Sequence, residues 1–251
     1  PRFAGDVLPK TAAGRVLSVI DKVDNIVATF SRGLIPTGSQ DPYALRRQTI
    51  GILNILIDSK WNVSLRPLLR EAMALLNVPA EKSDELLGQL EQFITLRLKN
   101  IYLDRALPHT VIDLLLSNPL TTVAMAEGMA AAIMKDRIDQ NTELVQAFTR
   151  IYNLVKDTEF VAVDEGLLKE TAEKELFEQA SAAYEASRTA LEEEDYVKLV
   201  GTPDSLVPAI NQFFDAVMVM DKDEAIKQNR LQLLRLTYET MAVIGDVSTL
   251  K

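Results

Sequence analysis

The sequence predicts an all-α fold of about ten helices arranged in two packed helical units. Apolar residues recur at spacings of three and four along most of the chain, which is the period of an amphipathic helix. No stretch of four to eight residues alternates convincingly between apolar and polar side chains, as a half-buried strand would. Proline, glycine and short polar residues interrupt the apolar pattern at intervals, and these interruptions separate the helices.

Five helices are expected in a first domain at residues 1–118. Asp41 is expected to cap the second of them, with Pro42 at its first helical position, where a missing N–H costs nothing. Ser64 is expected to cap the third, and Trp61 just before it to act as an anchor in the core or at a hinge. The five helices span residues 11–30, 42–60, 64–76, 83–102 and 108–118.

Two helices at 120–135 and 141–155 are expected in a connecting segment, residues 119–163, with Asn141 as the cap of the second. A second domain is expected at residues 164–251. Asp164 is predicted to cap its long first helix, and Gly245 to end its last one. The three helices of this domain span residues 167–190, 202–218 and 224–244.

Composition excludes several kinds of site. The 251 residues include no Cys and a single His, so disulfides, thiolate metal sites and multi-histidine metal sites cannot be built from this chain alone. His109, just before an apolar helical run, is expected to cap a helix or lie at the surface. The sequence contains no uncharged apolar run of about 18 residues, so no membrane span is predicted. The first residues lack a signal peptide, and a start at Pro1 suggests a fragment of a longer chain.

Charge is unevenly distributed along the sequence. The net charge of −9 argues against non-specific nucleic-acid binding by the whole chain. Residues 1–110 contain 14 Lys and Arg and 11 Asp and Glu, whereas residues 111–251 contain 13 and 25. The acidic excess lies mainly at 157–195, which is typical of the solvated face of a long helix. An acidic partner-binding surface is the alternative.

Residues 32–47 form the first candidate site. Gly33, Pro36 and Gly38 exclude regular structure, and the segment leads into a helix N-terminus. Such a terminus attracts anions, and Arg46 and Arg47 one turn inside the helix strengthen that attraction. The segment is therefore either a loop that joins two helices or a contact for a phosphate group.

The last two helices form the second candidate site. Their hairpin has a turn at 217–224, followed by Lys227, Asn229, Arg230 and Arg235. Asn229 and Arg230 can contact base edges or phosphates of a nucleic acid. They can equally stabilise the hairpin by hydrogen bonds to carbonyl groups, and the pattern alone leaves both interpretations open.

Several sequence blocks resemble the β subunit of bacterial glycyl-tRNA synthetase. The blocks near the two ends are the most specific, and residues 167–176 match more weakly. In order along the chain, the specific blocks are residues 1–9, 20–24, 36–47, 213–220, 229–231 and 245–250. Thr249 departs from the family pattern, which more often has an apolar or small residue there.

The resemblance implies a carboxy-terminal part of that subunit, containing an HD-like helical region and a DALR-type anticodon-binding helical bundle. In this family the α subunit carries the catalytic core and uses ATP with Mg to join glycine to tRNA. The β subunit supplies tRNA recognition. The implied partners are tRNA(Gly), the α subunit and the rest of the β subunit, in the cytoplasm and without a membrane. The fragment alone is expected to be non-catalytic and to hold no cofactor.

The resemblance also implies roles for particular residues. The tRNA-facing candidates are Arg46, Arg47, Lys227, Asn229, Arg230 and Arg235. Asp21 lies where an HD fold places its last metal-binding aspartate, but the preceding histidine positions are missing, so neither a metal nor hydrolase activity is expected. A structural or ion-pair role is expected for Asp21 and Asp24. A helical scaffold for α and β assembly, with little RNA contact, is the alternative function, and an HD-type phosphohydrolase is a third.

Overall fold

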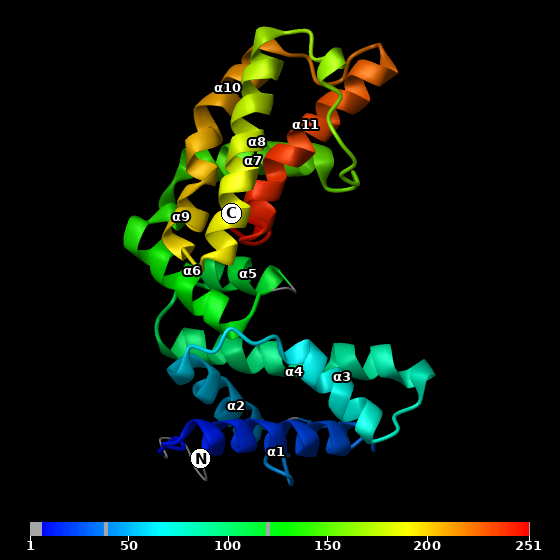
Figure 1. The fold of residues 1–251 in the computed structure, drawn as a ribbon, viewed down its shortest axis with the longest axis vertical. Coiled ribbons are helices and arrows are strands. Elements are labelled where there is room, and N and C mark those ends of the chain that lie inside the picture. The colour runs from blue at the N-terminus through cyan, green and yellow to red at the C-terminus, as the bar shows by residue number, and fades with distance from the viewer. Residues whose placement is uncertain (1–6, 38–39, 119–120, 251) are drawn as a thin grey trace. The chain divides into compact units, whose positions relative to one another are not determined.

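The computed structural model describes residues 7–37, 40–118 and 121–250, and the all-α prediction is confirmed (Figure 1). In these ranges no β pairing is present beyond an isolated bridge between Thr37 and Gln40. The helices are α1 (Ala12–Phe30), α2 (Leu45–Ser59), α3 (Leu65–Leu75), α4 (Ala80–Asp104), α5 (His109–Ser117), α6 (Val123–Asp136), α7 (Thr142–Val155), α8 (Thr171–Glu192), α9 (Tyr196–Gly201), α10 (Val207–Ala216) and α11 (Glu224–Ala242).

The chain divides into two compact units, and the division differs from the expected domain boundaries at 118 and 163. Unit 1 comprises residues 1–107 and 120–127, and unit 2 comprises residues 108–119 and 128–251. Helix α5 therefore belongs with the second unit, and the division falls inside α6. Helix α7, which was expected in a connecting segment, packs against α10 and α11 in unit 2.

Unit 1 is built from α1, α2, α3 and α4. Helix α1 begins after Thr11, whose hydroxyl accepts a hydrogen bond from the Gly14 N–H at 3.1 Å. It packs against both α2 and α3. At the centre of this unit, the rings of Phe30 and Phe93 meet edge to face with their centroids 5.0 Å apart. Burial of each such side chain contributes about 1.5–3 kcal/mol to folding.

The start of α2 corrects one expectation. The carboxylate of Asp41 accepts hydrogen bonds from the N–H groups of Leu45 at 2.8 Å and Arg46 at 3.0 Å, as a capping residue does. Helix α2 nevertheless begins at Leu45, so the placement of Pro42 at its first position is wrong. A turn closed by the Ala44 N–H on the Asp41 carbonyl separates the two, and Ala44 has a left-handed φ of 55°.

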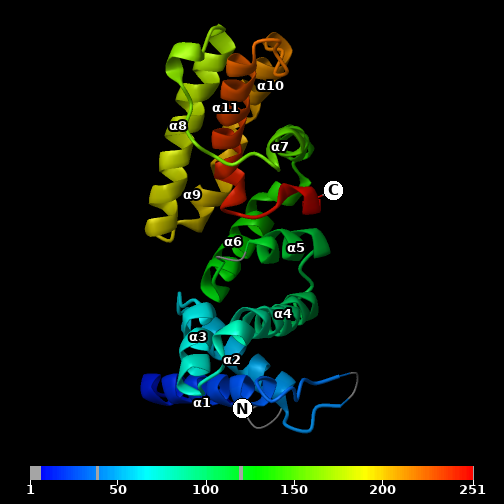
Figure 2. The same cartoon turned by 90° about the vertical axis from the view of Figure 1, so that its right-hand side faces the viewer.

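Unit 2 is a helical bundle in which α11 packs against α8 and α7, and α10 packs against the same two helices (Figure 2). Phe148, Leu176 and Phe213 are fully enclosed in its core. The short helix α9 was not expected, because six residues are too few to display a helical period. Its Tyr196 ring lies directly against Gly128 of α6, in space that a Cβ atom would fill.

Contacts with residues 243–246, near the carboxyl end of the chain, hold α5 within unit 2. The Asp246 N–H donates to Ser117 Oγ at 2.7 Å, and Asn118 Nδ2 donates to the Val243 carbonyl at 2.8 Å. Gly245 lies against the carbonyl of Leu114, where no side chain fits. These contacts between residues more than a hundred positions apart explain why residues 108–118 belong to the carboxy-terminal unit.

Candidate nucleic-acid interface

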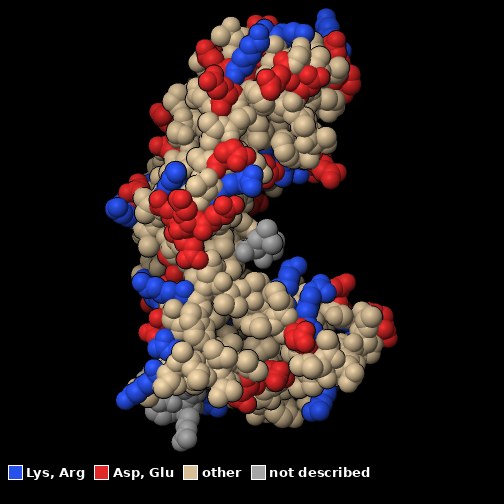
Figure 3. Space-filling model, viewed as in Figure 1, with Lys and Arg blue, Asp and Glu red and all other residues tan. Residues whose placement is uncertain are grey.

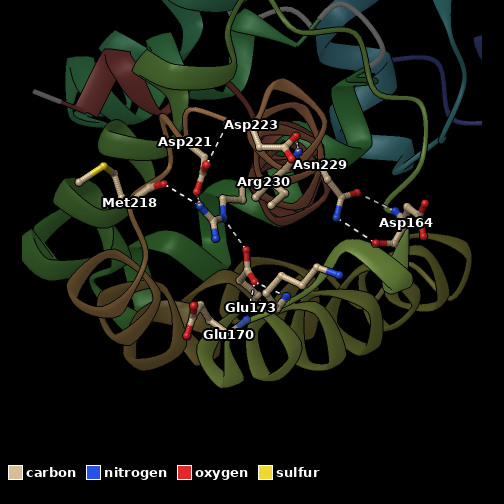
Figure 4. A network of polar contacts seen from close by, with 10 residues as sticks. Asp164, Glu170, Glu173, Met218, Asp221, Asp223, Asn229 and Arg230 are labelled. Atoms are coloured by element: carbon tan, nitrogen blue, oxygen red, sulfur yellow. Dashed lines mark hydrogen bonds and ion pairs between the residues drawn. The ribbon is translucent and has the colours of Figure 1, made fainter.

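The guanidinium group of Arg230 is the centre of a buried polar network at one end of the unit 2 bundle (Figure 4). Its Nε donates to Glu173 Oε1 at 2.5 Å, from α11 to α8. Its Nη1 donates to the Met218 carbonyl at 2.9 Å and to Asp221 Oδ2 at 2.7 Å. Burial alone lowers the pKa of Arg230, but the hydrogen bonds and charges of Glu173 and Asp221 outweigh it and raise the pKa.

Glu173 connects this network to the beginning of α8. Its side chain is fully buried, and its Oε2 accepts hydrogen bonds from the N–H groups of Lys169 at 2.6 Å and Glu170 at 2.7 Å. Glu170 and Glu173 form a capping box, so α8 begins at Thr171. The prediction that Asp164 caps this helix is wrong, because Asp164 instead caps a 3₁₀ turn at 165–167.

Asn229 fixes the connector at 157–168. Its Nδ2 donates to the Asp164 carbonyl at 2.9 Å, and its Oδ1 accepts from the Asp164 N–H at 2.7 Å. Gln232, on the same helix, makes an equivalent pair of contacts with the Val161 N–H at 2.9 Å and the Glu159 carbonyl at 3.1 Å. Each side-chain amide thus donates to one backbone carbonyl and accepts from one backbone N–H of the connector, and the two together hold it against α11.

These contacts correct the expectation that Asn229 and Arg230 face tRNA. The two residues are 6% and 5% exposed, and the Asn229 amide and the Nε and Nη1 groups of Arg230 are bonded to groups of unit 2. These contacts leave little of either side chain for an RNA. Their contacts are those of the alternative that the sequence left open, in which the two residues stabilise the hairpin by internal hydrogen bonds. The network fixes the turn at 217–223 and the connector at 157–168 to α11.

The turn at 217–223 presents residues that the sequence analysis did not select. Val217 and Val219 point inward and are 6% and 8% exposed, whereas Met218 and Met220 point outward and are 76% and 51% exposed. Lys222 follows on the exposed side. The alternation of Val and Met is the sequence signal that distinguishes the two faces of this extended segment. Arg230 ties this turn to α11 through the Met218 carbonyl and the Asp221 carboxylate.

Lys227 and Arg235 lie farther along α11 and are partly exposed. Lys227 Nζ pairs with Glu224 at 3.1 Å, and Arg235 Nη2 pairs with Glu239 at 2.7 Å. The Arg235 guanidinium also lies 5.8 Å from the ring centroid of Tyr238. Acidic side chains are interspersed among Lys and Arg on the face shown in Figure 3. Any phosphate contact in unit 2 therefore depends on a few side chains.

Arg46 and Arg47 lie in the first turn of α2 in unit 1, and Arg47 is exposed. The structure brings Arg46 close to Arg97 of α4, a residue that was not selected from the sequence. Arg97 stacks 3.7 Å from the Phe93 ring centroid and donates to the Phe93 carbonyl at 2.9 Å. Burial, and then the charge of Arg46, lowers the pKa of Arg97, while Asp41 opposes this shift.

The carboxylates of Asp21 and Asp24 point into solvent on α1. Across residues 7–37, 40–118 and 121–250, no group of three or more His, Cys, Asp or Glu side chains is arranged to hold a metal ion. Within the same residues, no helix combines the length and apolar character needed to cross a membrane.

Comparison with protein families finds a match for two stretches of the chain. Residues 1–117 match the family described as glycyl-tRNA synthetase beta subunit. Residues 143–247 match the DALR anticodon binding domain, and they lie within unit 2. The second match therefore covers the bundle of α7, α8, α10 and α11 together with the turn at 217–223.

Curated proteins similar to this chain are named glycine–tRNA ligase beta subunit. The protein of Clostridioides difficile strain 630 is 40% identical over 250 residues, which cover 99% of this chain and 36% of the relative. The protein of Desulforamulus reducens is 38% identical over 253 residues, with the same two shares. That of Syntrophomonas wolfei is 35% identical over 251 residues. The chain thus spans about a third of the length of the relatives it matches.

Proposed function

Because the chain belongs to the family of glycyl-tRNA synthetase β subunits, we propose that it provides tRNA recognition for the attachment of glycine to tRNA. In this proposal the α subunit performs the ATP-dependent chemistry, with Mg, in the cytoplasm. The chain itself contributes no catalytic residue and no cofactor. Its partners are tRNA(Gly), the α subunit and the remainder of the β subunit.

The observation that carries the proposal is the coincidence of the DALR anticodon binding domain match with the unit 2 bundle. Recognition of an unpaired RNA loop requires a preorganised surface, because a flexible one must lose conformational entropy on binding. The Arg230 and Asn229 contacts supply this rigidity at one end of the bundle. They act as positioning residues in the proposal, and other side chains contact the RNA.

The contacting side chains that we propose in unit 2 are those exposed near this fixed end. Lys222 is available for a phosphate, and the outward Met218 offers an apolar surface to an unpaired base. Lys227 and Arg235 remain proposed contacts, which requires them to exchange their carboxylate partners for phosphates. In unit 1, Arg46 and Arg47 remain proposed contacts for the tRNA backbone.

The test is binding of the purified chain to tRNA(Gly) and to a non-cognate tRNA over a series of salt concentrations. We expect affinity for tRNA(Gly) to fall with salt, and Lys222→Ala to reduce the slope of log K against log salt by about 1. Lys198→Ala, at another exposed lysine of unit 2, is the matched control and should leave the slope unchanged. No glycyl-adenylate should form with glycine and ATP.

Absence of any difference between the two tRNAs at all salt concentrations would reject the proposal. Gel filtration of the chain with the α subunit, with and without tRNA, then tests the alternative of a helical scaffold. That alternative predicts a complex with the α subunit that forms equally well without tRNA. The excess of acidic residues at 111–251 supports it, because this part of the chain repels RNA.

A further inference from the structure

Helix α1 carries an apolar stripe that stays exposed among the residues of unit 1 that the structure describes. Val16, Leu17 and Ile20 are 44%, 68% and 47% exposed, and Ala13 is also exposed. Positions 13, 16, 17 and 20 share one face of a helix, because residues three, four and seven apart line up. Isolated apolar side chains at a surface are ordinary, but a continuous stripe along one helix marks an interaction surface.

The buried residues of α1 lie beside the stripe and not opposite it, because Val16, Ile20, Val23 and Val27 follow one another at spacings of four, three and four. Val23, Ile26 and Val27 are buried against the neighbouring helices, with 5%, 1% and 0% of their surface exposed. Both ribbon views place α1 at the edge of unit 1, with α2, α3 and α4 on its other side (Figures 1 and 2). Helix α1 therefore has one apolar face that is wider than the neighbouring helices cover, and its exposed part lies toward the amino-terminal end.

The charges that border the stripe restrict what can cover it. Asp21 and Asp24 are exposed at its carboxyl-terminal end, and Lys22 is folded back onto Ser18, whose Oγ lies 2.6 Å from its Nζ. Two exposed carboxylates repel the phosphates of RNA. They favour a protein helix that places Lys or Arg beside them and apolar residues against Leu17.

We infer that this stripe is the surface on which the remainder of the β subunit packs. About two-thirds of the length of each relative lies outside the segment that matches this chain. Segments of one polypeptide meet at a high effective concentration, so they are favoured over a separate partner for an apolar surface of this size. The inference rests on the proposed function only in taking the chain as part of a β subunit, and it does not require tRNA binding.

Hydroxyl-radical footprinting of two proteins tests the inference, without α subunit or tRNA. One protein is the 251-residue chain, and the other is a full-length β subunit that contains it. Oxidation of Leu17 and Ile20 should be about fivefold slower in the full-length protein, because packed side chains lose contact with solvent. Leu75, which is 72% exposed on α3, is the matched internal control and should be oxidised equally in both.

A substitution gives a second readout. Leu17→Asp should lower the midpoint of thermal unfolding of the full-length protein by about 2–4 °C or more, and leave that of the 251-residue chain unchanged. Leu75→Asp should change neither protein. Equal oxidation of Leu17 in both proteins would overturn the inference. Protection that requires the α subunit, or that rises with concentration of the 251-residue chain, would also overturn it by assigning the stripe to the α subunit or to a second copy. Because tRNA is absent, none of these results depends on tRNA recognition.

Discussion

The two arginine-bearing regions selected from the sequence differ in what surrounds their cations. In the terminal hairpin, Arg230 lies between the carboxylates of Glu173 and Asp221, and its pKa is raised. At the start of α2, burial and then the charge of nearby Arg46 lower the pKa of Arg97, while Asp41 opposes the shift. The first arrangement sets two carboxylates against one arginine, whereas the second sets two arginines against one carboxylate, Asp41, beside a helix N-terminus.

This difference shows how to separate an architectural arginine from one that can bind an anion. A guanidinium that is 5% exposed and already donates to two carboxylates and a carbonyl has little left to offer a phosphate. Two guanidinium groups placed close together repel each other, and an anion relieves that repulsion. The comparison predicts opposite outcomes for substitutions in the two regions, in stability and in RNA affinity.

The largest expected effect is loss of stability on removing Arg230. Arg230→Met leaves Glu173 buried without its countercharge, and the free energy of unfolding should fall by about 3–5 kcal/mol. Urea denaturation followed by circular dichroism measures this change. Arg188→Met is the matched control, because Arg188 pairs with Glu185 in an exposed position, and it should cost less than about 1 kcal/mol. Equal costs for the two variants would contradict the structural role of Arg230.

The next largest effect is a loss of stability on removing either of the two side-chain amides that hold the connector, Asn229 and Gln232. Asn229→Ala removes two hydrogen bonds from a buried site and should cost about 1–3 kcal/mol of unfolding free energy. Gln232→Ala removes the corresponding pair at a more exposed position and should cost less. Amide hydrogen exchange at Asp164 and Val161 should accelerate selectively in the respective variants. Uniform acceleration throughout unit 2 would show that the amides do not act locally.

The sequence predicted the helical fold well because most helices here bury a regular apolar stripe. The network around Arg230 could not be predicted in the same way. Glu173 reads as one more acidic residue on a polar helix, and its burial depends on α11 packing across α8. Short elements such as α9 and the turn at 41–44 were also not predicted, because they contain too few residues to show a helical period.

The candidate site was predicted as a segment more reliably than as a set of residues. The hairpin at 217–235 was selected because it is rich in polar and cationic residues, and the structure shows that its buried cations and amides support the exposed turn. Arg97 was not selected because its proximity to Arg46 comes from the packing of α4 near the start of α2, some fifty residues away. Residue roles of this kind depend on tertiary contacts, which composition and spacing do not encode.

A smaller effect on stability is expected in the second arginine region. Arg97→Met loses a cation–π contact but removes the repulsion with Arg46, so the unfolding free energy should change by less than about 1 kcal/mol. Affinity for tRNA(Gly) should fall, and the slope of log K against log salt should decrease by about 1, if this cluster contacts a phosphate. Arg66→Met, at an exposed ion pair with Glu91 in the same unit, is the matched control. A large loss of stability in Arg97→Met would remove the contrast with Arg230.

The smallest effect is a pH dependence that belongs to the Arg230 network alone. The backbone N–H of Asp223, opposed by partial desolvation and helped by Arg230, lowers the pKa of the Asp221 carboxyl. A carboxyl whose pKa is lower in the folded state stabilises the fold above its ordinary pKa, near 4, and this contribution disappears as pH falls through the lower, folded value. Between pH 6 and pH 3 the thermal midpoint of the parent chain should therefore fall more steeply than that of Asp221→Asn, which cannot lose a proton. Parallel curves for the two proteins would mean that the ionised form of Asp221 contributes nothing to holding the turn, and the contrast between the two regions would then rest on Glu173 alone.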